Sequence, residues 1–296
     1  MYVIAGATGR VGHQVADNLL AALGPERADQ VRMLTRNPAG ASSLAQTGAE
    51  VAEVDLRDDR AVQQALRGAE AFFAMLPFDL SQDDLAAHAE AISSSLATAV
   101  ARAGTPRVVM LSSIGADLPS GTGPIAGVHA LEQHLSETGA IVTAFRPTHF
   151  QEKVGDLLDA ARREGIYPVF ATTADRPVPM VATRDVAEFL AQAMLTPAAA
   201  SETVDVVGPS YTEREVASTL ATALGRPVDV VVIPEPGWQS SLQEAGFSAP
   251  VAASLAQMYH ADDAGQLLPR GDRVVHGDTE LATTIAGMLA GESSPR

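Results

Sequence analysis

Short apolar runs alternate with longer amphipathic stretches through the first half of the chain. The apolar runs cover residues 2–5, 31–34, 50–54, 71–75, 108–111 and 142–145, and Gly, Pro, Asp or Arg residues bound them. Near-continuous apolar strands are typical of a sheet that is covered on both faces. Helical patterns cover residues 11–23, 41–47, 60–66, 80–103 and 125–138. This alternation predicts an α/β fold with a doubly wound parallel sheet and helices on both of its faces.

The pattern changes after residue 150. Helical patterns cover 154–163 and 212–224, and the segments 167–170 and 176–180, the second marked by prolines, lie between them. Strand candidates cover 204–207 and 228–233, and helices dominate from residue 234 onward. Thr183 is expected to cap a further helix that ends at residue 195. We therefore predict a first domain at residues 1–150, with 182–197 packing back on it, and a smaller α/β C-terminal lobe at 151–296. Residues 291–296 are expected to be disordered.

A glycine-rich turn follows the first predicted strand. Gly6, Gly9 and Gly12 are spaced Gly-x-x-Gly-x-x-Gly and lead into the first predicted helix. Glycine allows a sharp turn and lets a pyrophosphate approach the backbone, while the free N–H groups of a helix N-terminus attract negative charge. Between a strand and a helix, this turn predicts a Rossmann-type dinucleotide site; a turn that only connects two elements is the alternative.

The second and third predicted strands indicate which dinucleotide would bind. A fold that prefers NAD usually has Asp or Glu at the end of the second strand. This chain has Arg36 there, and a guanidinium matches the geometry of a phosphate. The sequence therefore favours NADP(H), although Arg36 would also fit as a solvated loop residue. Asp55 ends the third strand and is a candidate for binding the adenine amino group or for capping the next helix.

Composition limits the function classes. The 20 Lys and Arg against 36 Asp and Glu give a formal charge of −16, which argues against nucleic-acid and membrane surfaces as partners. Arg36 and Arg10 must therefore form a local positive site within a repulsive field. The chain has no cysteine and no recognised metal-ligand spacing, so we expect no metal site. We interpret the sequence cluster of His260, Asp262 and Asp263 as a solvated helix face.

The N-terminus shows no targeting segment and no apolar run is long enough to span a bilayer, so the sequence predicts a cytoplasmic protein. The expected partner is a small-molecule substrate. The sequence leaves a homodimer open.

Several motifs together resemble the NmrA-like family of atypical short-chain dehydrogenase/reductases. They are the segments 6–12, 35–38, 111–115, 145–150, 180–187 and 207–217. The resemblance implies a Rossmann domain, a small C-terminal lobe with substrate between the two, and binding of NADP(H). It implies no single activity, because the family includes quinone and phenylcoumaran-type reductases as well as redox-sensing regulators.

The resemblance also implies positions for the cofactor. The pyrophosphate would lie over the backbone of the turn, from Thr8 through Gly9, Arg10 and Val11 to Gly12, and the 2′-phosphate on Arg36. Leu76 and Pro77 would lie beside the riboses of the cofactor. Ser112 and Ser113 would lie near the nicotinamide, and the segment from Pro147 to Phe150 would close over its ring. Each of these loop residues also fits an ordinary turn.

The position of the usual catalytic pair is altered. Typical short-chain dehydrogenases use Tyr-x-x-x-Lys on the helix after the fifth strand, where a spacing of four puts both groups on one face. Here these positions are Ile125 and His129, and the only lysine, Lys153, has His149 four residues before it. His129 could donate a proton or bind the nicotinamide ribose, oriented by Glu132 or Gln133, or it could bond only to the backbone.

Other groups could also donate the proton. Ser113 is a second catalytic candidate, and His149, Tyr167, Tyr211 and Tyr259 are weaker alternatives. Reduction of a quinone or enone does not strictly need the missing tyrosine. We therefore predict an NADP(H)-dependent oxidoreductase that acts on a small apolar acceptor. A redox sensor without catalysis and a non-redox isomerase or lyase remain the alternatives.

Overall fold

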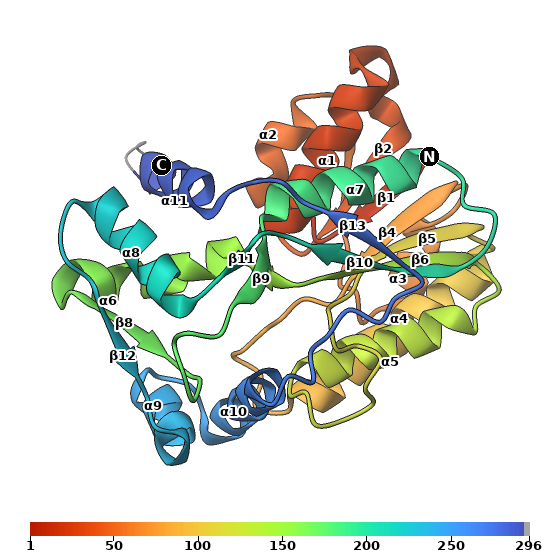
Figure 1. Cartoon of the computed structure of the whole chain (residues 1–296). Helices are drawn as coiled ribbons and strands as arrows, with labels where there is room; N and C mark the ends of the chain where they lie inside the picture. Colours follow the sequence, from red (N-terminus) through yellow and green to blue (C-terminus); the bar gives the residue numbers. More distant parts are fainter. Residues whose placement is uncertain (293–296) are drawn as a thin grey trace.

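An eight-stranded parallel sheet forms the centre of the molecule in the computed structural model, which describes residues 1–292 (Figure 1). Its strands are β1 (Tyr2–Ala5), β2 (Val31–Thr35), β3 (Glu50–Glu53), β4 (Ala71–Met75), β5 (Arg107–Leu111), β6 (Ile141–Pro147), β10 (Glu202–Val207) and β13 (Arg273–His276). They lie in the order β13-β10-β6-β5-β4-β1-β2-β3, and every neighbouring pair is parallel. The order reverses beside β1, as in a doubly wound dinucleotide-binding sheet. The predicted fold class is confirmed.

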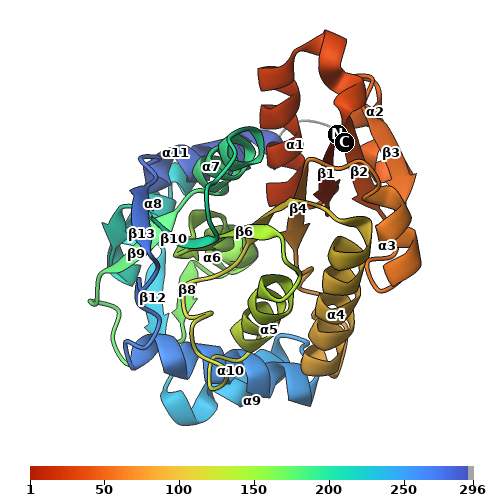
Figure 2. The same cartoon turned by 90° about the vertical axis from the view of Figure 1, so that its right-hand side faces the viewer.

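Helices cover both faces of this sheet. One face carries α1 (Arg10–Leu23) and α7 (Thr183–Leu195), and the other carries α3 (Asp59–Ala65), α4 (Leu85–Ala103) and α5 (Ile125–Ser136) (Figures 1 and 2). Side chains of β1 alternate between the two faces of the sheet. Ile4 belongs to the apolar core under α1, and Val3 belongs to the core under α4. This division explains why the strand is apolar throughout.

The second half of the chain adds two small sheets and further helices. The sheets pair β11 (Ser210–Tyr211), β9 (Val178–Val181) and β7 (His149–Phe150), and β12 (Asp229–Val232) with β8 (Ile166–Val169). The helices are α6 (Leu158–Arg163), α8 (Glu213–Leu224), α9 (Trp238–Glu244), α10 (Ala249–Asp263) and α11 (Leu281–Glu292). The short α2 (Ser42–Ala45) lies in the first half. A separate apolar core surrounds Trp238 and takes in Leu80 and Leu85 of the first half.

The main sheet crosses the predicted boundary at residue 150, since β10 and β13 come from the second half of the chain. Helix α7 packs against α1, as the prediction for residues 182–197 requires. Helix α11 continues to residue 292, so the expectation of disorder is wrong for residues 291–292. The rest of that segment, 293–296, lies outside the described residues.

One predicted helix start and one predicted helix cap are wrong. Helix α4 begins at Leu85 rather than residue 80, because the Asp84 side chain accepts from the Ala87 N–H and caps it. Thr183 is the first residue of α7 and not its cap. Its N–H and hydroxyl both donate to the carboxylate of Glu152, at 2.9 and 2.6 Å, which supplies the missing acceptor from another segment.

Candidate functional site

The glycine-rich turn brings the first strand into close contact with the first helix. Gly6 has φ +68°, in the left-handed region that favours glycine. A Cβ on Gly12 would lie 2.2 Å from the carbonyl oxygen of Gly6 and 2.7 Å from its carbonyl carbon. The Gly9 N–H donates to the same oxygen at 2.9 Å. The first turn of α1 therefore lies against the backbone of the turn, with no room for a side chain at residue 12.

The N-terminus of α1 is open. Its N-cap residue is Gly9, so no side chain caps the helix, and the first turn carries no acidic residue. Arg10 is exposed at the first helical position, while Val11 is buried behind it. Uncapped N–H groups, the positive end of the helix dipole and one guanidinium together favour an anion here.

The end of β2 lies beside this turn. The hydroxyls of Thr8 and Thr35 are 3.4 Å apart, and the Asn37 N–H donates to the Thr35 hydroxyl at 3.0 Å. Arg36, between these residues, is exposed and its charge acts on Asp55 at the end of β3. The predicted pyrophosphate and 2′-phosphate positions therefore lie along the carboxyl edge of neighbouring strands.

Asp55 binds an arginine in its own loop. The Arg57 guanidinium donates to both carboxylate oxygens, at 3.1 and 2.6 Å. Hydrogen bonding with Arg57 and its positive charge lower the pKa of Asp55 to about 2. The alternative role as a helix cap is wrong, because Asp58 caps α3 by accepting from Arg60 and Ala61.

The loops after β4, β5 and β6 meet at the same edge of the sheet. The Ile114 N–H donates to the Pro147 carbonyl at 3.1 Å and joins the last two loops. After β4, Leu76 is buried, Pro77 is half-buried and Phe78 is exposed. Phe150, three residues beyond β6, packs against the core beneath α7.

Both predicted serines have hydrogen-bonding partners within the protein. The Ser112 hydroxyl donates to Glu132 of α5 and the Ser113 hydroxyl to the Ile114 carbonyl. Glu132 also accepts from Arg146, at 2.9 and 2.5 Å, and both side chains are buried. The hydrogen bond and charge of Glu132 raise the pKa of Arg146. The expected orientation of His129 by Glu132 is therefore wrong, because a buried arginine on β6 holds that carboxylate instead.

His129 lies half-buried on α5, and one ring nitrogen is fixed. Its Nδ1 donates to the Ala116 carbonyl at 2.7 Å, so the neutral ring has an acceptor at Nε2. Among the described residues, Nε2 has no hydrogen-bonding partner. The sequence offered a hydrogen bond to the backbone as the alternative to a catalytic or cofactor role for His129. That bond is present, and it still leaves Nε2 available to a ligand.

A second group of polar side chains was not predicted from the sequence. Asp262 of α10 accepts from His149 Nε2 at 3.3 Å and from Arg176 at 2.9 Å. Burial raises the pKa of Asp262, but these two partners outweigh it and lower the pKa overall. The interpretation as a solvated helix face is wrong for Asp262, whose side chain is 19% exposed. The intervals between residues 149, 176 and 262 are too long for a sequence pattern to reveal the group.

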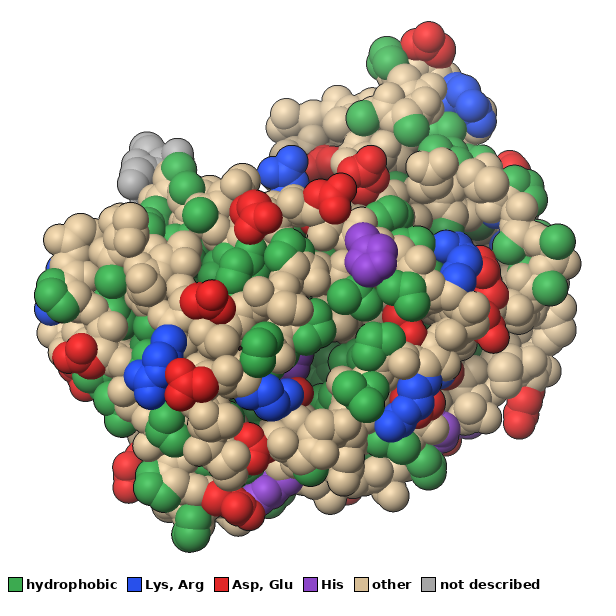
Figure 3. Space-filling model, viewed as in Figure 1, with side chains coloured by type: hydrophobic (Ala, Val, Ile, Leu, Met, Phe, Trp, Pro, Cys, Tyr) green, Lys and Arg blue, Asp and Glu red, His purple; other side chains and the backbone are tan. Residues whose placement is uncertain are grey.

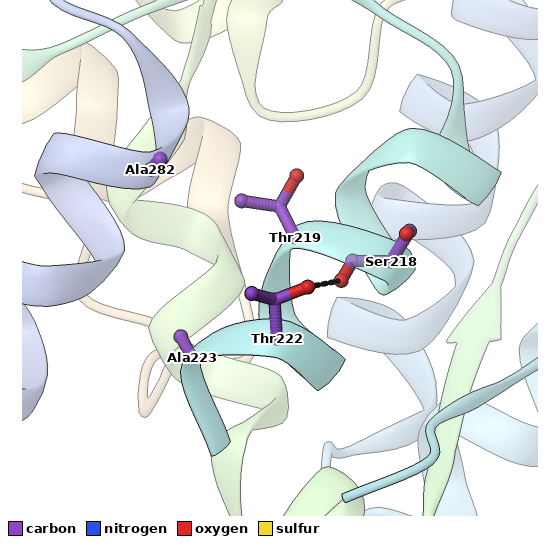
Figure 4. Close-up of a pocket in the computed structure, with 5 residues that line it drawn as sticks. All are labelled: Ser218, Thr219, Thr222, Ala223 and Ala282. Carbon is purple, nitrogen blue, oxygen red and sulfur yellow. Dashed lines mark hydrogen bonds between the residues drawn. The ribbon is translucent and has the colours of Figure 1, made fainter. Parts of the chain in front are cut away.

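The space-filling view shows a hollow near the middle of one face, with hydrophobic side chains around it and charged atoms close by (Figure 3). A different groove, between α8 and α11, is lined by Ser218, Thr219, Thr222, Ala223 and Ala282 (Figure 4). Its threonine hydroxyls donate to carbonyls of their own helix, as for Thr222 and Ser218 at 3.0 Å. The hydrogens of the two threonine hydroxyls are therefore used within α8.

Within residues 1–292, no group of three or more His, Asp or Glu side chains could hold a metal ion. None of the helices in this part of the chain has both the length and the apolar character needed to cross a bilayer.

Residues 2–268 match the sequence model of the NmrA-like family. An NAD(P)H azoreductase of Xenophilus azovorans is 29% identical over 262 residues, which cover 88% of this chain and 86% of that protein. A (4-alkanoyl-5-oxo-2,5-dihydrofuran-3-yl)methyl phosphate reductase of Streptomyces griseus is 30% identical over 259 residues, covering 87% and 85%. The structure of an NADPH-dependent quinone oxidoreductase of Escherichia coli in complex with NADPH superposes with a TM-score of 0.77 at 23% identity, covering 98% and 100% of the two chains.

Proposed function

The chain belongs to the NmrA-like family, and from this premise we propose that it is an NADP(H)-dependent oxidoreductase. Its substrate would be a small, largely apolar acceptor such as a quinone or an enone. Bound NADPH would supply the hydride.

One observation carries the proposal: the glycine turn ends in an uncapped helix, and Arg36 lies on the neighbouring strand end. The turn has no space for a Cβ at residue 12 and offers free N–H groups to an anion. Arg36 gives a 2′-phosphate a cationic partner, in a chain whose overall charge would repel it.

The complete set of residues that we assign to the cofactor follows the carboxyl edge of the sheet. It comprises Gly6, Thr8, Gly9, Arg10, Val11, Gly12, Arg36, Asp55, Leu76, Pro77, Ser112, His129, Pro147 and Phe150. Ser112 and Leu76 contribute through their backbone or packing, because the Ser112 hydroxyl binds Glu132 and Leu76 is buried.

The residues of α5, the helix after β5, fit an acceptor whose reduction needs no tyrosine as proton donor. Ile125 is buried at the start of α5 and cannot donate a proton. His129 presents Nε2 and would bind the nicotinamide ribose or the acceptor. Ser113 would have to release the Ile114 carbonyl before it could donate to a substrate. Of the three relatives, the quinone oxidoreductase is named for an acceptor of this class. The other two are named for an azo compound and for a dihydrofuranone that carries a phosphate ester.

Titration with NADPH and NADH, followed by NADPH oxidation against quinones, enones and aldehydes, tests the proposal. We expect NADPH to bind more tightly than NADH. Arg36→Ala should weaken NADPH by about 10- to 100-fold, as expected for loss of a charged hydrogen bond, and leave NADH nearly unchanged. Equal effects on both would contradict the 2′-phosphate assignment. Tight NADPH binding without oxidation by any acceptor would favour a redox sensor.

A further inference from the structure

We propose that His149, held by Asp262 of the second half of the chain, is the proton donor to the reduced acceptor. The inference rests on the proposed function and adds the acid that the altered Tyr-x-x-x-Lys position does not supply.

The position of His149 suits this role. It lies two residues after the end of β6 and begins β7, so it lies at the carboxyl edge of the sheet, where α/β folds bind their ligands. Its side chain is 40% exposed and can therefore reach both a ligand and solvent. The Thr148 N–H donates to the Val206 carbonyl at 3.0 Å and fixes the backbone just before it.

The Asp262 contact orients the ring. Nε2 of His149 lies 3.3 Å from Oδ1 of Asp262, and Nδ1 has no hydrogen-bonding partner among residues 1–292. A carboxylate on one ring nitrogen stabilises the imidazolium and fixes which nitrogen faces the substrate. Arg176 donates to the other oxygen of Asp262 at 2.9 Å and keeps the carboxylate in place.

The groups around this pair come from several elements. Glu213 at the start of α8 lies close enough to feel the charges of His149, Asp262 and Arg176, and burial raises its pKa. Tyr167 of β8 faces Glu213, and burial raises its pKa well above the usual value. The positive charge of Arg176 opposes the imidazolium, whereas the two carboxylates favour it.

The three tyrosine candidates are engaged elsewhere. Tyr167 is buried at the Glu213 carboxylate. The Tyr211 hydroxyl donates to Glu280 at 2.5 Å and accepts from the Leu281 N–H. Tyr259 stacks on Phe170, with ring centroids 4.9 Å apart and planes 7° apart, and burial raises its pKa. His149 therefore has the exposure and the free nitrogen that these side chains lack.

The step is balanced for both acceptor classes. The hydride would come from NADPH held by the glycine turn and Arg36; it would bring the acceptor two electrons and one hydrogen and would leave NADP⁺. The imidazolium of His149 gives its Nδ1 proton to the oxyanion of the reduced quinone or to the enolate of the reduced enone. The neutral ring keeps its Nε2 proton toward Asp262 and regains the Nδ1 proton from water.

Three variants test the assignment with the full-length chain and NADPH. His149→Ala should lower kcat on the order of 100-fold, the lower range for general acid catalysis, while the Kd for NADPH stays unchanged. Wild-type kcat should fall as pH rises, because only the imidazolium can donate the proton. His149→Ala should lose this dependence, and added imidazole should restore turnover. Asp262→Asn should move the fall to lower pH, because the imidazolium loses its carboxylate. His13→Ala is the matched control, since His13 is 39% exposed and lies 3.5 Å from Asp17 on α1; it should leave kcat and its pH profile unchanged.

The outcomes separate the two proposals. A wild-type chain that binds NADPH but reduces no acceptor overturns the proposed function. Wild-type turnover together with a His149→Ala variant of equal kcat and unchanged pH profile overturns the proton donor alone. Loss of activity that imidazole does not restore also contradicts the assignment, because a merely structural role gives that result.

Discussion

Replacement of Gly12 by alanine should damage the cofactor site through the backbone alone. The new Cβ would lie 2.2 Å from the Gly6 carbonyl oxygen and 2.7 Å from its carbonyl carbon. Both are backbone atoms of a turn whose oxygen already accepts from the Gly9 N–H, so neither can move aside as a flexible side chain could.

The size of the effect follows from the shift required. Carbon atoms in contact prefer a separation of about 3.5–4.0 Å, so the start of α1 must move away from Gly6 by about 1 Å. Strain of this kind costs about 1–3 kcal/mol of folding free energy, which a domain of ordinary stability survives. A shift of the helix N–H groups that loses one charged hydrogen bond to a phosphate should raise the Kd for NADPH by roughly 10- to 100-fold.

Urea unfolding and fluorescence titration with NADPH measure the two effects separately. Gly287→Ala in α11 is the control, because its Cβ would meet nothing within 4 Å; it should leave the Kd unchanged and stabilise the helix by about 0.5–1 kcal/mol. Lower stability with wild-type NADPH affinity for Gly12→Ala would refute the placement of the pyrophosphate on this helix. Unchanged stability would refute the contact itself.

Three further predictions follow from other contacts. Gly9→Ala should fold normally, since its Cβ would lie 3.3 Å from the Gly6 carbonyl oxygen, yet weaken NADPH in titration if the pyrophosphate approaches there; an unchanged Kd would contradict that approach. Glu132→Gln leaves buried Arg146 without its counter-charge and should cost about 3–5 kcal/mol in urea unfolding, most of which a double replacement by methionine should recover. Asp55 has a folded pKa of about 2, below its ordinary 3.8, so its ion pair stabilises the fold above pH 3.8 and loses this effect as pH falls toward 2. Arg57→Ala should therefore lower stability slightly at neutral pH, because solvent screens this exposed pair, and denaturation curves of the two proteins should converge on acidification.

The parts of the fold that depend on local pattern were predictable from the sequence. The apolar strands, the glycine turn and the helix at residues 183–195 each have a signal within one short segment, and β1, β4 and α7 have the predicted bounds. β13 was missed because Arg273–His276 is short and largely exposed, and only its pairing with β10 makes it a strand of the main sheet.

The site was predictable only in its cofactor half. Glycine spacing and an arginine after the second strand are local features. Glu132 pairs with Arg146, a buried residue 14 positions away in the sequence. The spacing along α5 predicted instead that Glu132 would contact His129. The pairing of His149 with Asp262 joins residues 113 positions apart, so only the folded arrangement of α10 against the loop after β6 reveals it.

The central claim, reduction of an apolar acceptor by NADPH, is tested most directly by the absorbance of NADPH at a fixed concentration of the wild-type chain and a naphthoquinone. The account predicts steady NADPH oxidation that saturates with both ligands and slows when the transferred hydrogen at the nicotinamide C4 is deuterium. A chain that binds NADPH tightly, yet leaves its absorbance unchanged with every quinone and enone offered, would contradict it.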